Sequence, residues 1–108
     1  MSKQVIYTNT STVPGREITE ILGVVTGNVV QSKHVGKDIG AFLKTVVGGE
    51  IKSYTIMLTE ARQTAINRMV AEARKMGADA VVSIRFATSS IMSGSAEILA
   101  YGTAVKLR

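Results

Sequence analysis

The chain has 108 residues, a formal net charge of +5 and no cysteine, which favours a single domain, residues 1–108, with a modest hydrophobic core. Without cysteine, disulfides, thiolate metal ligands and a cysteine nucleophile are excluded. The basic residues are scattered and aromatic residues make up only 5% of the chain, so we do not expect a nucleic-acid-binding protein.

The first third of the chain favours β-structure. Gln4–Thr8 is a short β-prone run, and Val13-Pro14-Gly15-Arg16 has the Pro-Gly pair that suits the middle of a type II turn. Ile18–Val30 is rich in β-branched residues and predicts a long strand. We expect Ile21, Val25 and Val29 to share one face with Gly23 and Gly27, and Leu22, Val24 and Val30 to share the other.

A polar segment and a short amphipathic pattern follow. Gln31–Lys37 contains His34, the only histidine of the chain. Ile39, Phe42, Leu43 and Val46 then recur at helical spacing, with Asp38 at the positive N-terminal end. This pattern predicts a short helix, which Gly48-Gly49 ends.

The strongest pattern in the sequence predicts a long helix from Ser53 to Gly77. Ser53 is the expected N-cap, and Gly77 is the expected C-terminal stop. Ile66 and Val70 widen an apolar stripe that recurs every three or four residues: Tyr54, Leu58, Ala61, Ala65, Met69, Ala73 and Met76.

Two further strands are predicted after this helix, at Ala78–Ala87 and Glu97–Leu107, with Thr88–Ser95 as a serine-rich hairpin loop. In the first strand we expect one face to carry Ala80, Val82, Ile84 and Phe86, and the other Asp79, Val81, Ser83 and Arg85. In the second, a row of mostly small residues, on which a helix could lie closely, is formed by Ile98, Ala100, Gly102 and Ala104.

These elements predict an α+β, two-layer fold with a mainly antiparallel sheet and one long helix. A helix covers one face of such a sheet, so strands with a wet second face should alternate between apolar and polar residues. Ile18–Val30 and Glu97–Leu107 are largely apolar on both faces. We therefore expect a homo-oligomer in which another copy covers the second face.

Five short motifs occur in the order and spacing of the YbjQ-like family, which this chain resembles over nearly its whole length: Val13-Pro14-Gly15-Arg16-Glu17-Ile18, Leu22-Gly23-Val24-Val25-Thr26-Gly27, Val46-Val47-Gly48-Gly49, Gly77-Ala78-Asp79-Ala80-Val81-Val82 and Gly102-Thr103-Ala104-Val105. The resemblance implies a dodecin-like β-α-β-β unit that assembles as a ring, usually a homopentamer. It also implies a cytoplasmic protein whose family label proposes heavy-metal binding.

The residues of this chain do not favour that metal function. Members of the family often carry acids in the strand after Gly77-Ala78-Asp79-Ala80, but here Arg85 stands where an acid is typical. Soft metals prefer thiolates or clustered imidazoles, and hard cations prefer several carboxylates. We therefore expect no metal site and no cofactor, with His34, Asp38 and Glu97 as the weak candidates for a ligand shared between subunits.

The other polar and aromatic residues are more typical of structural contacts than of catalysis. Asp79 and Glu97 are isolated carboxylates, more typical of surface or capping groups than of an acid–base pair. Arg85 either pairs with an acid across a subunit contact or binds an anion. Tyr54 and Tyr101 favour packing at an interface or a core edge.

We expect a protein without catalysis, with no catalytic residue to assign. The first hypothesis is a ring-forming homo-oligomer that binds a small ligand or ion between subunits. The second is a structural or regulatory scaffold that binds another protein through its outer helices. No signal-peptide core and no run of about 18 apolar residues occurs in the sequence, so we expect a cytoplasmic protein that is not inserted in a membrane.

Overall fold

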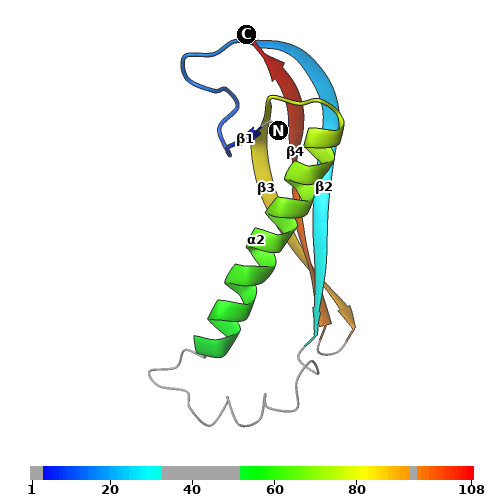
Figure 1. Ribbon diagram of the computed structural model, residues 1–108. Helices are drawn as coiled ribbons and strands as arrows, with labels where there is room; N and C mark the ends of the chain where they lie inside the picture. The colour runs from blue at the N-terminus through cyan, green and yellow to red at the C-terminus, as the bar shows by residue number, and fades with distance from the viewer. Residues whose placement is uncertain (1–3, 33–51, 93–94) are drawn as a thin grey trace.

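The computed structural model describes residues 4–32, 52–92 and 95–108. In chain order the elements are β1 (Ile6–Tyr7), β2 (Ile18–Ser32), α2 (Lys52–Lys75), β3 (Ala80–Met92) and β4 (Ser95–Leu107). The helix lies along one face of the sheet, so the chain has the two-layer α+β architecture expected from the sequence (Figure 1).

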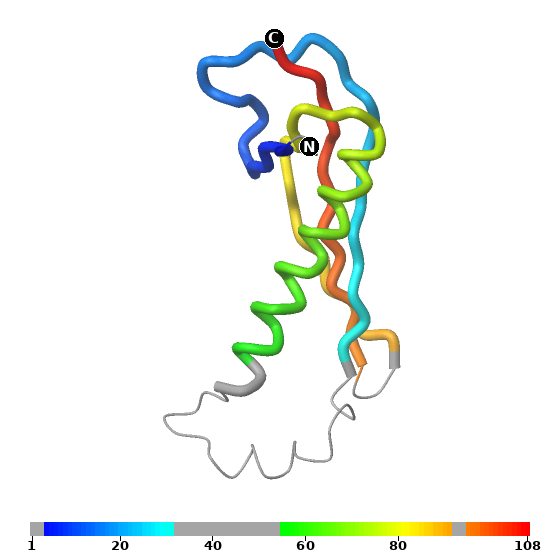
Figure 2. Tube along the Cα trace, viewed as in Figure 1, coloured from blue at the N-terminus to red at the C-terminus, as the bar shows by residue number. Residues whose placement is uncertain are grey.

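The sheet has the strand order β1-β3-β4-β2. β3 and β4 form an antiparallel hairpin, and β2 runs antiparallel to β4 along its whole length, from Ile18 opposite Leu107 to Ser32 opposite Ser95. β1 is short and pairs parallel with the start of β3. The sheet is therefore mixed but mainly antiparallel, and β1 and the end of β4 lie at the end of the molecule where α2 finishes (Figure 2).

Helix α2 confirms the predicted long helix, and each of its ends lies within two residues of the predicted end. After Lys75 the chain turns at Gly77, which has a φ of 78°. The Ala78 N–H donates to the Ala73 carbonyl and the Gly77 N–H donates to the Arg74 carbonyl, the pair of bonds that defines a Schellman motif. At the other end the N-cap prediction is wrong, because Ser53 already lies inside the first helical turn.

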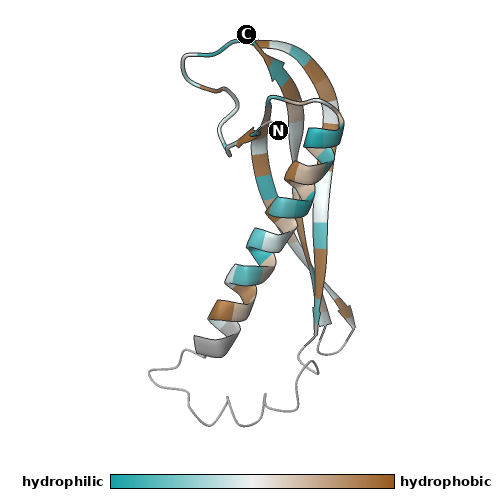
Figure 3. Cartoon of the chain, viewed as in Figure 1, coloured by the Kyte–Doolittle hydropathy of each residue, from teal (hydrophilic) through white to brown (hydrophobic). Residues whose placement is uncertain are grey.

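The apolar stripe of α2 is buried through its centre. Ala61, Ala65, Met69 and Ala73 are almost fully enclosed, and they pack on Val25 and Val29 of β2 and on Ile98, Ala100 and Ala104 of β4. Leu58 and Met76, at the two ends of the stripe, are exposed. In Figure 3, hydrophilic bands follow most of the visible surface of α2, while hydrophobic stretches occur on all three long strands.

Two irregularities reverse the predicted strand faces. In β2 the register shifts between Ile21 and Gly23, so Leu22 packs near the helix and Ile21 lies on the opposite face. In β3 the register shifts between Val82 and Arg85. A β-bulge adds an unpaired residue and changes the alternation that follows it, which strict period-two counting missed.

The second shift makes the predicted β3 faces wrong in part. Val81 belongs to the core beneath α2, together with Ile84 from beyond the bulge. Ala80 and Val82 instead lie on the opposite face. Ser83, between Val82 and Ile84, has a φ of 55°, which is uncommon for a residue with a side chain.

The remaining predictions concern turns and loops. The Arg16 N–H donates to the Val13 carbonyl and Gly15 has a φ of 79°, as the type II turn requires. The serine-rich loop prediction is wrong, because β3 continues to Met92 and β4 begins at Ser95. The predicted short helix at Ile39–Val46 lies outside the described residues. Within the described chain, no helix is both long and apolar enough to cross a membrane.

Candidate functional site

The sheet face turned away from α2, here called the far face, is covered at one end only. There the turn segment places Val13 against a small cluster formed by Ala80, Val82 and Val105. Ile18 and Leu107 pack at the margin of this cluster. This cover is the second hydrophobic core of the chain, and it stops near the two register shifts.

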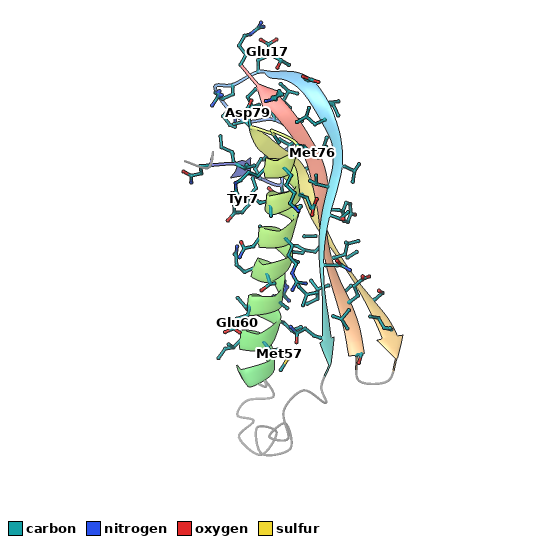
Figure 4. All side chains as sticks on the ribbon, turned by 45° about the vertical axis from the view of Figure 1, so that its right-hand side comes forward. Tyr7, Glu17, Met57, Glu60, Met76 and Asp79 are labelled. Atoms are coloured by element: carbon teal, nitrogen blue, oxygen red, sulfur yellow. The ribbon has the colours of Figure 1, made fainter. Side chains whose placement is uncertain are left out.

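Beyond that cover the far face exposes a row of apolar side chains. Ile21 is 72% exposed, Val24 73%, Val30 59% and Tyr101 37%. We call these four residues the far-face row. Figure 4 shows side chains projecting from β2 on the side away from α2. A fully exposed Val, Leu or Ile forgoes about 1.5–3 kcal/mol of burial energy, so the row is a surface that gains stability when it is covered.

The polar residues beside this row are bonded to one another. The Asn28 side-chain amide donates to Glu97 Oε2 at 3.0 Å. Arg68 reaches across from α2 and donates through Nη1 to the Asn28 carbonyl at 2.6 Å. Glu97, one of the three weak metal candidates, therefore accepts a hydrogen bond from the Asn28 side chain, and this bond links β4 to β2.

Asp79 and Arg85 also have local partners. A carboxylate oxygen of Asp79 accepts the Leu107 N–H at 2.8 Å, which ties the start of β3 to the end of β4. Arg85 Nη1 donates to the carbonyls of Asn9 and Ile84, at 3.0 and 2.9 Å. Both alternatives for Arg85, an acid across a subunit contact or a bound anion, involve a group outside this chain and stay predictions.

Two open hollows flank the sheet on the side of the helix. One, of about 510 Å³, follows the outer edge of β2 and is lined by Val24–Asn28 together with Arg68, Ala71, Glu72 and Met76. The other, of about 570 Å³, lies at the outer edge of β3 and is lined by Tyr7, Thr8, Asn9, Ile66, Ile84, Arg85 and Phe86. Volumes of 300–1,000 Å³ are typical of small-molecule sites, although each of these hollows is open to solvent.

The metal candidates do not form a site in the part of the chain that the structure describes. His34 and Asp38 lie outside those residues, as does the side chain of Tyr54. Among residues 4–32, 52–92 and 95–108 there is no group of three or more His, Cys, Asp or Glu side chains able to hold an ion. Asp79 and Glu97 are bonded to different neighbours, so the described geometry gives no acid–base pair.

The sequence interpretation did not find the Arg68–Asn28 contact or the hollows. Arg68 lies outside the apolar stripe of α2, and its partner Asn28 is 40 positions away in the sequence. Phe86 was placed on the wrong row by the β3 bulge. The one signal in the sequence was the apolar character of both faces of β2, which indicates the far-face row.

Comparison with known proteins places the chain among uncharacterised relatives. A family model of the YbjQ family, described as "Putative heavy-metal-binding", matches residues 5–108. A UPF0145 protein of Psychromonas ingrahamii is 69% identical over 103 residues, covering 95% of this chain and 98% of that protein. A UPF0145 protein of the archaeon Archaeoglobus fulgidus is 65% identical over 108 residues, covering all of both chains.

A solved structure has a similar fold. It is a crystal structure of a protein of unknown function of the DUF74 family from Pediococcus pentosaceus, with a TM-score of 0.64 over 96% of this chain and 98% of that one. The sequence identity is 15%, so this likeness concerns the fold alone.

Proposed function

Because the chain belongs to the YbjQ family, we propose that it is a cytoplasmic, non-catalytic protein that assembles as a homo-oligomeric ring and binds a small ligand or ion between its subunits. The expected ring is the homopentamer of dodecin-like units that the family resemblance implies. The observation that carries the proposal is the far-face row: four apolar side chains that a second copy of the chain would cover.

The dimensions of the subunit support assembly. Its extents are 52 × 27 × 26 Å and its radius of gyration is 17.0 Å, whereas a compact chain of 100 residues has a radius of about 13 Å. The strands also extend beyond the helix, since the 15 residues of β2 span about 50 Å and the 24 residues of α2 about 36 Å. An elongated subunit of this kind buries less apolar surface alone than in contact with its copies.

The donor groups of the chain do not fit a heavy-metal site within one subunit. There is no cysteine and one histidine in the whole sequence, and soft metals require thiolates or clustered imidazoles. An ion held by this protein would need carboxylates or His34 contributed by several subunits. We therefore place a small ligand ahead of a heavy metal.

The alternative function, a scaffold that binds another protein through α2, has less support. The described outer side of α2 is polar, with Arg62, Gln63 and Asn67 exposed. Large exposed apolar side chains on this helix are confined, among its described residues, to Ile56 and Leu58, and Met76 directly follows the helix. Met76 lies against the β2 side of the molecule and not on the outer side (Figure 4).

Native mass spectrometry of the untagged protein and of Val24→Glu tests the proposal. We expect a ring mass for the unchanged protein, with five subunits as the expected number. In Val24→Glu, a carboxylate replaces an apolar contact and weakens each subunit contact by about 2 kcal/mol or more, roughly 30-fold, so monomers should appear at micromolar concentration.

The matched control is Ile56→Glu, which introduces the same charge at an exposed apolar residue of α2. It should keep the ring mass. A monomeric unchanged protein would overturn the proposal. Rings that dissociate only in Ile56→Glu would show that the subunits contact each other through α2 and not through the far-face row. Additional mass in proportion to the subunit number would identify a bound ligand or ion.

A further inference from the structure

Two strand edges of the sheet are without a partner in the described chain. β2 is the last strand of the order β1-β3-β4-β2, so no strand of the described chain pairs with its outer edge along its 15 residues. The outer edge of β3 is paired by β1 and the segment after it only as far as Ile84, whose N–H donates to the Thr8 carbonyl. From Phe86 to Met92 this edge is free as well.

Both free edges have long stretches without the charged residues and prolines that usually prevent edge pairing. Natural monomers protect such edges with charged residues, prolines or bulges. Leu22–Ser32 and Phe86–Met92 contain no charged residue and no proline. The register shifts at Ile21–Gly23 and Val82–Arg85 lie at or before the start of these stretches, and a further shift at Ser90–Met92 lies at the end of the second one. Val24–Ser32 and Phe86–Ser90 keep a regular register with β4. The edges are therefore suited to receive another strand.

The bond between Arg68 and Asn28 shows which backbone groups of β2 point outward. Because the Asn28 carbonyl accepts from Arg68, it points away from β4. Outward and inward residues alternate in an antiparallel pair, so the backbones of Val24, Thr26 and Val30 point outward too. Their side chains lie on the far face, opposite Thr103, Tyr101 and Glu97 respectively.

In β3 the relation between backbone direction and sheet face is the reverse of that in β2. Tyr101 and Leu99 turn their backbones away from β2 and towards β3, where they pair with Arg85 and Ala87. On the outer edge of β3 the exposed backbone groups therefore belong to Phe86, Thr88 and Ser90, whose side chains lie on the helix face. The far-face residues of β3 point their backbones inward.

The outward-pointing backbone groups of β2 and β3 fit one arrangement of two copies. In a parallel ladder, a residue that bonds to its neighbour strand lies beside a residue whose own backbone points away. β2 and β3 run in the same direction within the subunit, since each is antiparallel to β4. We propose that β2 of one copy pairs in parallel with the Phe86–Met92 edge of β3 of the next copy, with both helices on the same side of a continuous sheet.

This inference rests on the proposed self-assembly and specifies its contact. A pairing of β2 with β2 across a two-fold axis would leave the β3 edge open in every copy. A contact between two different surfaces uses both edges and forms a ring if the rotation closes. It would also bring the hollow beside β2 and the hollow beside β3 together, so that Arg68, Glu72 and Met76 of one copy face Tyr7, Ile66 and Phe86 of the next.

Cysteine cross-linking tests this contact, because the natural chain has no cysteine. Val30 and Ser89 lie at the same level of the sheet, each opposite Glu97. The double variant Val30→Cys/Ser89→Cys, treated with a short bismaleimide, should give a ladder of covalent multimers on a denaturing gel, ending at the ring size. A second pair, Thr26→Cys/Ala87→Cys, samples a register shifted by two residues.

The single variants and a control pair make the result specific. Val30→Cys alone and Ser89→Cys alone should stay uncross-linked, as should Val30→Cys/Gln63→Cys, since Gln63 is on the outer side of α2. Dimers from Val30→Cys alone would indicate a β2–β2 contact and overturn the inference. Native masses of the same samples separate the two proposals: rings without a ladder in either pair overturn the edge pairing alone, whereas monomers overturn the assembly as well.

Discussion

Gly27 determines how closely the helix approaches the sheet. A Cβ atom built on this residue would lie 2.1 Å from the Ala65 carbonyl oxygen and 2.5 Å from the Met69 nitrogen. Both are backbone atoms of α2 and have no rotamer through which to move away. The alanines of the helix stripe and this glycine thus form one contact, in which backbone lies directly on backbone.

We expect Gly27→Ala to destabilise the fold by about 3 kcal/mol, the upper end of the usual cost of overpacking. The helix must shift away from β2, and the shift loosens the packing of Met69, which is fully buried. Urea unfolding monitored by circular dichroism measures the change in the free energy of unfolding. Arg62→Ala, at an exposed residue on the outer side of α2, is the control and should change stability by less than about 0.5 kcal/mol. Equal effects at the two positions would contradict this account of the contact.

At the scale of elements, the helix was predictable and the strand faces were predictable only in part. The stripe of α2 and the glycine that ends it are local signals, readable from neighbouring residues. The faces of β2 and β3 depend on register, and a single bulged residue exchanges every face beyond it. This explains why Val25, Val29 and the β4 row were placed correctly, while Ile21 and Val81 were not.

The candidate site was less predictable than the fold, for the same physical reason. The expectation of an uncovered apolar face came from composition along the strands, and the far-face row confirms that such a face exists in one subunit. The partners of Glu97 and Arg68 depend on which strand lies beside which helix turn, and no local pattern contains that information. The covering copy itself stays a prediction.

The bulge in β3 depends on the left-handed conformation of Ser83, and substitution there tests it. We expect Ser83→Val to lower the free energy of unfolding by about 1–2 kcal/mol, because a β-branched residue is disfavoured at positive φ. Ser83→Gly should be neutral or stabilising by up to about 1 kcal/mol, since it removes the same strain. Guanidinium unfolding of the two variants and the natural chain gives the comparison. A Ser83→Gly variant that is less stable than Ser83→Val would contradict the proposed origin of the bulge.

For the whole molecule, the far-face row and the free strand edges both lead us to expect self-assembly. The far-face row leaves apolar area in solvent, and the free edges of β2 and β3 leave backbone groups without strand partners. A second copy could satisfy the edges by pairing and could shield the row through the curvature of a closed sheet. Stability of the fold and assembly of the ring should then be one coupled equilibrium.

This coupling predicts that the melting temperature of the protein rises with its concentration. For a five-subunit ring that dissociates as it unfolds, a tenfold increase in concentration adds about 1 kcal/mol per subunit, which corresponds to roughly 4–8 °C for a domain of this size. Differential scanning calorimetry between about 5 and 500 µM, spanning two such steps, would measure the shift. Val24→Glu should melt at a lower temperature with little dependence on concentration, whereas Ile56→Glu should keep the slope of the natural chain. A melting temperature of the natural chain that does not change over this range would mean that the subunit is stable alone, and that its far-face row is covered by something other than its own copies.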